Sequence, residues 1–137
     1  MSIPTQTRAA TRTVRFQGGG LRFLDALAFR VVTRPLREAD DGQHWLVTEL
    51  GDGVSTIRQV TSGLFLAAAA DGERAVVAGD RRTIDSVRWR IEDFGGGFAS
   101  IEHVGSGRYL EATIGGDFGV VIRSAASSEQ TWRLGDA

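Results

Sequence analysis

Apolar residues along this chain alternate with polar ones or form short runs that end at glycine. In Trp89-Arg90-Ile91-Glu92 the two apolar side chains fall on one face of an extended chain and the two charged ones on the other. Gly95-Gly96-Gly97 interrupts this run, and a second begins at Phe98. A period of two bounded by glycine is typical of β-strands. Helical spacing is not sustained over three turns anywhere, so we predict strands and no helices.

The pattern repeats itself at an interval of 44 residues. The matched positions include tryptophans, Ser-Gly pairs and leucines, with no gap inserted: Trp45 and Trp89, Ser62-Gly63 and Ser106-Gly107, Leu66 and Leu110. A third copy is divided between the two ends of the chain, where Trp132 lies 43 residues beyond Trp89. Three units of about 42 residues therefore fill nearly the whole sequence, and such a period indicates a repeat architecture.

Each unit contains four predicted strands, which gives about twelve in all. One unit alone leaves its apolar face exposed, so the three units must close around a shared core. Propellers need at least four blades and β-helices use shorter periods. We therefore predict an all-β fold, a β-trefoil in which a six-stranded barrel is capped by hairpins. Residues 1–11 are predicted to be a flexible N-terminal tail, and 12–137 a single β-trefoil domain with repeats at about 12–53, 54–97 and 98–137.

Glycine-rich segments are predicted as turns between these strands. Asp71-Gly72 follows an alanine run and accepts the positive φ angles of a type I′ hairpin. Gly18-Gly19-Gly20 and Gly95-Gly96-Gly97 are not followed by a helix carrying Lys-Ser/Thr, so they are interpreted as turns and not as phosphate-binding loops.

Two Gln-x-Trp sequences occupy equivalent places in the outer repeats. These are Gln43-His44-Trp45 and Gln130-Thr131-Trp132, whereas Val87-Arg88-Trp89 keeps only the tryptophan. Gly107-Arg108-Tyr109-Leu110-Glu111-Ala112 resembles the Gly-x-Tyr-Leu-Asp-Ala stretch of ricin-type and fascin-like trefoils. Over roughly residues 12 to 136 the chain thus resembles the ricin-B-type β-trefoil lectin family, with fascin-like features.

The resemblance implies a sugar site in each complete repeat. In this family an aspartate follows the Tyr-Leu pair, an aromatic ring follows the third strand, and an amide lies near Gln-x-Trp; Glu111 departs from this pattern by one methylene. The acid and amide hydrogen-bond sugar hydroxyls, and the ring covers the apolar face of the sugar. The candidate ligand-binding residues are Asp25, Phe29, Asp41 and Gln43 in repeat 1, and Glu111, Asp117, Phe118 and Gln130 in repeat 3.

Departures from the family pattern leave a second hypothesis open. Ala67 replaces the acid of repeat 2, so no sugar site is expected there, and Arg34 and Arg123 stand where a ring is expected. Phe29 serves a sugar only if its turn directs the ring outward; the alternative is a core position. The favoured partner is a glycan or glycoconjugate. The alternative is a protein-interaction module, an inhibitor or fascin-like trefoil, that binds a protein partner through hairpin loops and the arginines of the first repeat.

Composition excludes several other classes of function. A net charge of −1 gives no general attraction to nucleic acid or to an anionic membrane. The chain has no cysteine, and its two histidines, His44 and His103, fall in different repeats with no Gly-x-Ser-x-Gly elbow. No metal-ligand spacing occurs either. We therefore expect a binding protein and not an enzyme, with no cofactor, no metal, no nucleic-acid partner and no membrane insertion.

The N-terminal residues contain no apolar segment that would serve as a secretory signal. We expect a cytoplasmic protein, with export by a route without a signal peptide left open. All 16 basic residues are arginine, which is typical of a GC-rich, arginine-biased genome.

Overall fold

The computed structural model describes residues 11–37, 41–79, 84–124 and 128–137. In these residues the chain forms twelve strands: β1 (Thr11–Gln17), β2 (Phe23–Leu27), β3 (Arg30–Arg34), β4 (Trp45–Gly51), β5 (Val54–Gln59), β6 (Phe65–Ala68), β7 (Ala75–Ala78), β8 (Trp89–Gly95), β9 (Phe98–His103), β10 (Arg108–Ala112), β11 (Val120–Arg123) and β12 (Thr131–Asp136). The predicted all-β fold is confirmed.

No α-helix occurs in the described residues, as predicted. Four single-turn 3-10 helices, which the sequence did not predict, link strands: η1 (Gly19–Leu21), η2 (Asp41–Gln43), η3 (Ile84–Val87) and η4 (Ser128–Gln130). Turns of three or four residues are too short to leave a periodic pattern in the sequence, and such 3-10 turns are common connectors. Three of them, η2 to η4, come just before the strands that begin at or next to a tryptophan, so they position the Gln-x-Trp segments.

Six strands form a closed barrel, because their antiparallel pairings return to the starting strand. β1 pairs with β4, β4 with β5, β5 with β8, β8 with β9, β9 with β12, and β12 again with β1. Each repeat supplies its first and fourth strands to this ring. A closed ring leaves no free strand edge in the barrel.

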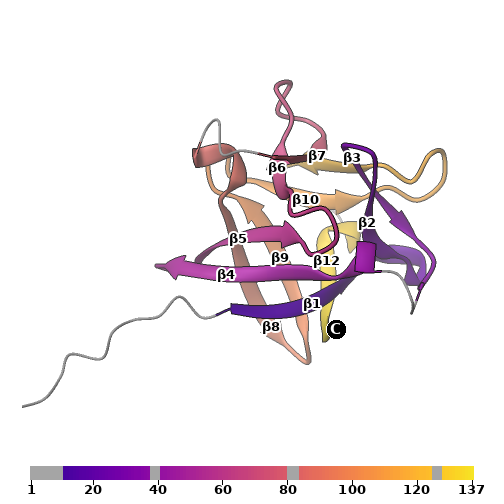
Figure 1. The fold of residues 1–137 in the computed structure, drawn as a ribbon, viewed down its shortest axis with the longest axis horizontal. Coiled ribbons are helices and arrows are strands. Elements are labelled where there is room, and N and C mark those ends of the chain that lie inside the picture. Colours follow the sequence, from indigo (N-terminus) through magenta and orange to yellow (C-terminus); the bar gives the residue numbers. More distant parts are fainter. Residues whose placement is uncertain (1–10, 38–40, 80–83, 125–127) are drawn as a thin grey trace, which may run out of the picture.

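The second and third strands of each repeat form a hairpin, and the three hairpins cap one end of the barrel (Figure 1). Equivalent backbone hydrogen bonds join each hairpin to a turn of the preceding one. The N–H groups of Thr33, Val77 and Ile122 donate to the carbonyl oxygens of Phe118, Phe29 and Glu73 at 3.0, 2.9 and 2.8 Å. The cap therefore has the pseudo-threefold symmetry that the repeat predicts.

Three buried tryptophans anchor the core. Trp45, Trp89 and Trp132 begin or lie near the start of β4, β8 and β12, and each indole N–H donates to a leucine carbonyl of the second strand in its own repeat. Around them pack aliphatic side chains that point inward from the alternating strands: Val14, Leu24, Val31, Val47, Ile57, Leu66, Val77, Ile101, Leu110, Val120 and Ile122.

The turn after β6 differs from the type I′ hairpin predicted for Asp71-Gly72. Only Gly72 has a positive φ, +71°, and its N–H donates to the carbonyl of Ala69 at 2.8 Å. The Asp71 carboxylate accepts the N–H groups of Glu73 and Arg74 at 2.9 and 3.2 Å. The prediction of turn type was wrong because this side chain hydrogen-bonds the following backbone and so favours a longer turn.

Candidate functional site

The acid and the amide predicted for repeat 1 lie together, but inside the protein. Gln43 donates from Nε2 to Oδ2 of Asp25 at 3.3 Å and to the carbonyl of Pro35 at 2.8 Å, and its Oε1 accepts the N–H of Arg37 at 3.1 Å. The Arg34 guanidinium lies 4.0 Å from the same Asp25 oxygen. Asp25 is only 2% exposed, so its carboxylate is occupied by protein groups.

Repeat 3 contains the same arrangement. Gln130 donates from Nε2 to Oε1 of Glu111 at 3.1 Å and to the carbonyl of Ser124 at 2.7 Å. The guanidinium of Arg123 binds the other Glu111 oxygen at 3.1 Å. Each outer repeat thus has an acid–amide–arginine network in which the acid and amide are buried and the arginine reaches the surface.

Repeat 2 replaces all three members of this network with apolar residues. The strand registers identify Ala67 as the equivalent of the acid and Ala78 as the equivalent of the arginine. Val87, two residues before Trp89, takes the place of the amide. A buried polar network with one member missing leaves unsatisfied groups, whereas an apolar replacement of the whole set leaves none. The network is therefore present or absent as a unit in each repeat.

Arg34 and Arg123 are the members of these networks that the sequence interpretation did not include among the site residues. At the predicted sugar sites Arg34 and Arg123 were noted for the missing aromatic ring, and Arg34 also belongs to the first-repeat arginines of the protein-binding alternative, yet both lie beside the buried acids. The register of the β2–β3 hairpin could have shown that Arg34 lies within reach of Asp25. Arg34 lies two residues beyond Val32, the direct cross-strand neighbour of Asp25, and such diagonal positions are within reach of long side chains.

Phe118 belongs to the surroundings of repeat 1 and not of repeat 3, where the sequence places it. It lies in the turn before β11, and its carbonyl accepts the N–H of Thr33. The Arg22 guanidinium carbon lies 3.7 Å from the centre of its ring. Phe118 and Arg22 line a cavity of about 260 Å³ together with Pro35 and Ile114. A turn from one repeat thus supplies the aromatic ring beside the next.

Phe29 points outward, so the core alternative for this residue was wrong. It lies in the turn between β2 and β3 and is 67% exposed. Its carbonyl accepts the N–H of Val77, which places this turn beside repeat 2, the repeat without an acid–amide–arginine network. Phe29 is therefore not brought together with Asp25 and Gln43.

The two remaining candidates differ in what the structure describes. Asp117 forms an ion pair with Arg30 at 3.2 Å and accepts the N–H of Gly119 at 3.0 Å, so it joins the hairpins of repeats 3 and 1. Asp41 begins η2, and its side chain lies outside the described residues.

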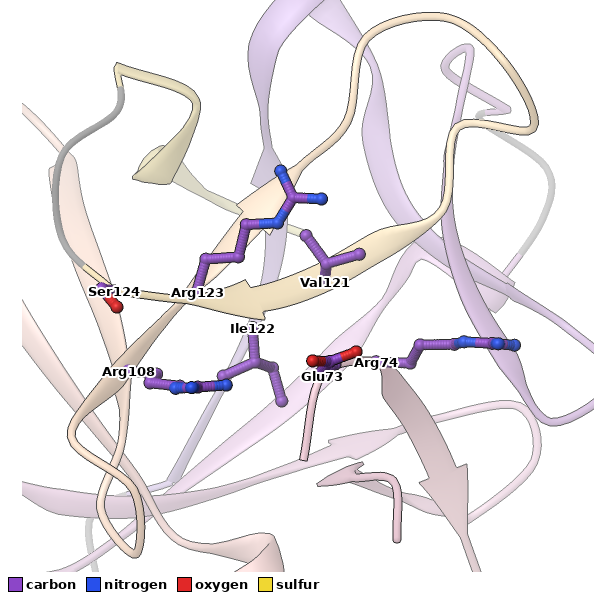
Figure 2. A pocket seen from close by; sticks show the side chains of 7 residues that line it. All are labelled: Glu73, Arg74, Arg108, Val121, Ile122, Arg123 and Ser124. Atoms are coloured by element: carbon purple, nitrogen blue, oxygen red, sulfur yellow. The ribbon is translucent and has the colours of Figure 1, made fainter. Parts of the chain in front are cut away.

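A larger cavity, of about 540 Å³, lies between the hairpins of repeats 2 and 3 (Figure 2). It is lined by the turn that precedes β7, the start of β10, and β11 with the residue that follows it: Glu73, Arg74, Arg108, Val121, Ile122, Arg123 and Ser124. Arg123 connects this cavity to the acid–amide–arginine network of repeat 3. The network of repeat 1 adjoins the smaller cavity through Pro35, whose carbonyl accepts from Gln43.

The two histidines lie apart and have separate partners. His44 Nε2 is 3.0 Å from a guanidinium nitrogen of Arg15, and His103 Nδ1 is 2.9 Å from the hydroxyl of Ser106. Within the described residues no group of three or more His, Cys, Asp or Glu side chains is arranged to hold a metal ion. None of the helices in the described part of the chain is long and apolar enough to cross a membrane.

Among the solved structures that resemble this chain, three illustrate the β-trefoil fold that it shares with them. The designed threefold-symmetric protein ThreeFoil is 22% identical (TM-score 0.76) over 91% of this chain and 99% of its own. The Polyporus squamosus lectin, bound to the human-type influenza-binding epitope Neu5Acα2-6Galβ1-4GlcNAc, is 18% identical (TM-score 0.74) over 91% of this chain and 49% of its own. SeviL bound to asialo-GM1 saccharide is 19% identical (TM-score 0.71) over 93% and 99%.

Comparison with curated proteins gives no match. The model of one family, described as ricin-type beta-trefoil lectin domain-like, matches residues 41–123. This range contains Gln43-His44-Trp45 of repeat 1, the whole of repeat 2 with Trp89, and the β10–β11 hairpin of repeat 3. The chain belongs to the ricin-type β-trefoil lectin domain-like family.

Proposed function

We propose that this protein binds carbohydrate without catalysis, through two sites, one beside repeat 1 and one beside repeat 3. One observation carries the proposal: the two repeats that keep an acid–amide–arginine network each adjoin a cavity, and repeat 2 has lost the whole network. Membership of a family described by its lectin domains supports carbohydrate binding in general. The separate partners of the two histidines give no support to a catalytic pair.

In this proposal the buried acids position arginines and do not touch the sugar. Glu111 holds the Arg123 guanidinium at the rim of the larger cavity, and Gln130 holds Glu111 from the interior. Asp25 and Gln43 hold the strand end that carries Arg34 and Pro35 in the same way. Guanidinium groups donate several hydrogen bonds in a fixed geometry, which suits a ligand rich in hydroxyl and carbonyl acceptors.

A glycan array probed with the full chain tests the proposal, with Arg123→Ala as the variant. Arg90 provides a matched control, because it pairs with Glu102 at the same 3.1 Å and lies away from both cavities. We expect Arg123→Ala to weaken glycan retention about tenfold, the loss of a charge-assisted hydrogen bond, and Arg90→Ala to leave it unchanged. Retention of no glycan, or equal loss in both variants, contradicts the proposal.

A second candidate, protein binding through a hairpin loop, is favoured by the exposed apolar residues at the tip of the β2–β3 hairpin. Leu27, the last residue of β2, is 47% exposed, and Phe29, in the turn that follows, is 67% exposed. Exposed apolar side chains that form one patch are typical of interaction sites. A partner captured by the wild-type chain and lost with Phe29→Ser, while glycan binding is absent, favours this candidate.

A further inference from the structure

We propose that the cavity between repeats 2 and 3 selects a saccharide that carries a carboxylate group, with Arg108 as its anchor. The inference rests on the proposed carbohydrate binding and adds the chemical class of the ligand. It concerns the 540 Å³ cavity alone, whose volume falls within the range usual for small-ligand sites.

Arg108 is the cation of this cavity whose charge is available to a ligand. Among the described residues no carboxylate lies within ion-pairing distance of it, whereas Arg123 binds Glu111 at 3.1 Å and Arg74 lies 3.7 Å from Asp71. Figure 2 shows the Arg108 guanidinium directed toward the middle of the cavity, while Arg74 points away from it. A guanidinium in this position binds a planar carboxylate with two parallel hydrogen bonds.

Glu73 limits which anions the cavity accepts. Its carbonyl is fixed by the N–H of Ile122, and Figure 2 shows its carboxylate on the other side of the Ile122 side chain from Arg108. A carboxylate repels a compact anion such as phosphate but accepts hydrogen bonds from hydroxyl groups. The ligand that fits both walls has a negative charge at one end and hydroxyls at the other, as an acidic sugar does.

The apolar part of the cavity favours charge over stacking as the source of affinity. Its accessible apolar lining is aliphatic, from Val121, because Ile122 is fully buried in the core, and the lining contains no aromatic ring. Neutral hydroxyls gain little by exchanging water for protein, whereas charge-assisted hydrogen bonds are roughly twice as strong as neutral ones. The net charge of −1 provides no general attraction to acids, so selectivity depends on the local arginine.

The equivalent cavity beside repeat 1 lacks this property, although it has an arginine at the matching position. The Arg22 guanidinium donates to the carbonyl of Thr33 at 2.6 Å and covers the ring of Phe118. Its hydrogen bonds are therefore directed to the protein. The acid selectivity is assigned to the repeat 3 cavity only.

The test uses pairs of immobilised glycans that differ only in a terminal uronic or sialic acid, probed with the full chain. We expect the acidic member of a pair to be retained at least tenfold more tightly, and Arg108→Gln to remove this preference. Arg108→Lys keeps the charge without the planar fork, so it should retain part of the preference. Arg12→Gln is the matched control, because Arg12 is an exposed arginine on the barrel strand β1 and its loss changes the net charge equally.

The outcomes separate this inference from the function on which it rests. Equal retention of acidic and neutral members, or a preference that survives Arg108→Gln, overturns the acid selectivity and leaves carbohydrate binding in place. Retention of no glycan overturns the proposed function itself. Displacement of the acidic glycan by inorganic phosphate at equal concentration also overturns the inference, because Glu73 should exclude that anion. Thermal melting of each variant checks that a loss of retention does not come from unfolding.

Discussion

The indole Nε1 of Trp132 donates a hydrogen bond to the carbonyl oxygen of Leu110 at 3.0 Å, inside the barrel. The same bond joins Trp45 to Leu24 at 3.0 Å and Trp89 to Leu66 at 2.9 Å. Each bond connects the fourth strand of a repeat to its second strand, and so fixes the hairpin cap to the barrel.

Trp132→Phe should destabilise the fold by about 2 kcal/mol, because phenylalanine removes the donor and leaves a buried carbonyl unsatisfied. The smaller ring also leaves a cavity. Urea unfolding measures the change. Trp45→Phe and Trp89→Phe serve as internal comparisons and should give losses within about 1 kcal/mol of it, because the three sites have equivalent partners. An unchanged unfolding midpoint for any one of them contradicts the equivalence.

Replacing the whole network of repeat 1 with the apolar residues of repeat 2 should lower the free energy of unfolding less than removing one member of the network does. Gln43→Val alone leaves the Asp25 carboxylate and the Pro35 carbonyl without their amide partner, at a cost of about 3 kcal/mol. The triple variant Asp25→Ala, Arg34→Ala and Gln43→Val removes the charges as well. We expect the triple variant to be more stable than the single one in urea unfolding. Additive losses from the three substitutions would show that the residues do not act as a unit.

Two adjacent glycines should respond differently to alanine. A Cβ at Gly18 lies 2.9 Å from Trp132 Cζ3 and 3.1 Å from the Ala112 Cβ, so Gly18→Ala should overpack the core and cost about 1–3 kcal/mol. At Gly19 the nearest atom is the Ile114 Cδ1 at 3.4 Å, so Gly19→Ala should change the melting temperature little. A fall in the melting temperature with Gly19→Ala that equals the fall with Gly18→Ala contradicts this explanation.

The turn that carries Glu73 and Arg74 should loosen in acid. The N–H of Glu73, and after it that of Arg74, donates to the Asp71 carboxylate and lowers the pKa of Asp71 below its ordinary value. A depressed folded-state pKa means that the ionised carboxylate stabilises the turn at neutral pH, and that this contribution is lost as the pH falls below about 4.

Amide hydrogen exchange at Glu73 and Arg74 measures the loosening of this turn as Asp71 is protonated. We expect protection to fall with acid in the wild-type chain and to be independent of pH in Asp71→Asn, which keeps an acceptor oxygen but does not titrate. A wild-type profile that shows no acid transition contradicts the assignment.

The sequence predicted the features that one repeat specifies by itself. The four-strand unit and its threefold repetition follow from periodicity, and the grouping of Asp25 with Gln43 in one repeat follows from the family resemblance, although not their hydrogen bond to each other. It did not predict features that depend on two repeats. Phe118 was assigned to its own repeat because sequence shows neighbours along the chain, whereas the cap places its carbonyl against Thr33. The direction of Phe29 was also left open, because a turn residue with no periodic context has no predicted face.

The contacts of charged side chains were the other feature that the sequence did not predict. The position of Arg123 was visible in the sequence, but its bond to Glu111 depends on the rotamers of two long side chains across a hairpin. Composition alone treats such residues as solvated.

The hydrogen bonds between successive hairpins also constrain how the three copies can diverge. Each cavity has one wall from one copy and the other wall from its neighbour, as Glu73 and Arg108 show. A substitution in one turn therefore alters the cavity of an adjoining copy, and an isolated copy has only one wall of it. If the chain arose by duplication of a shorter gene, each of its cavities formed only once two neighbouring copies were joined.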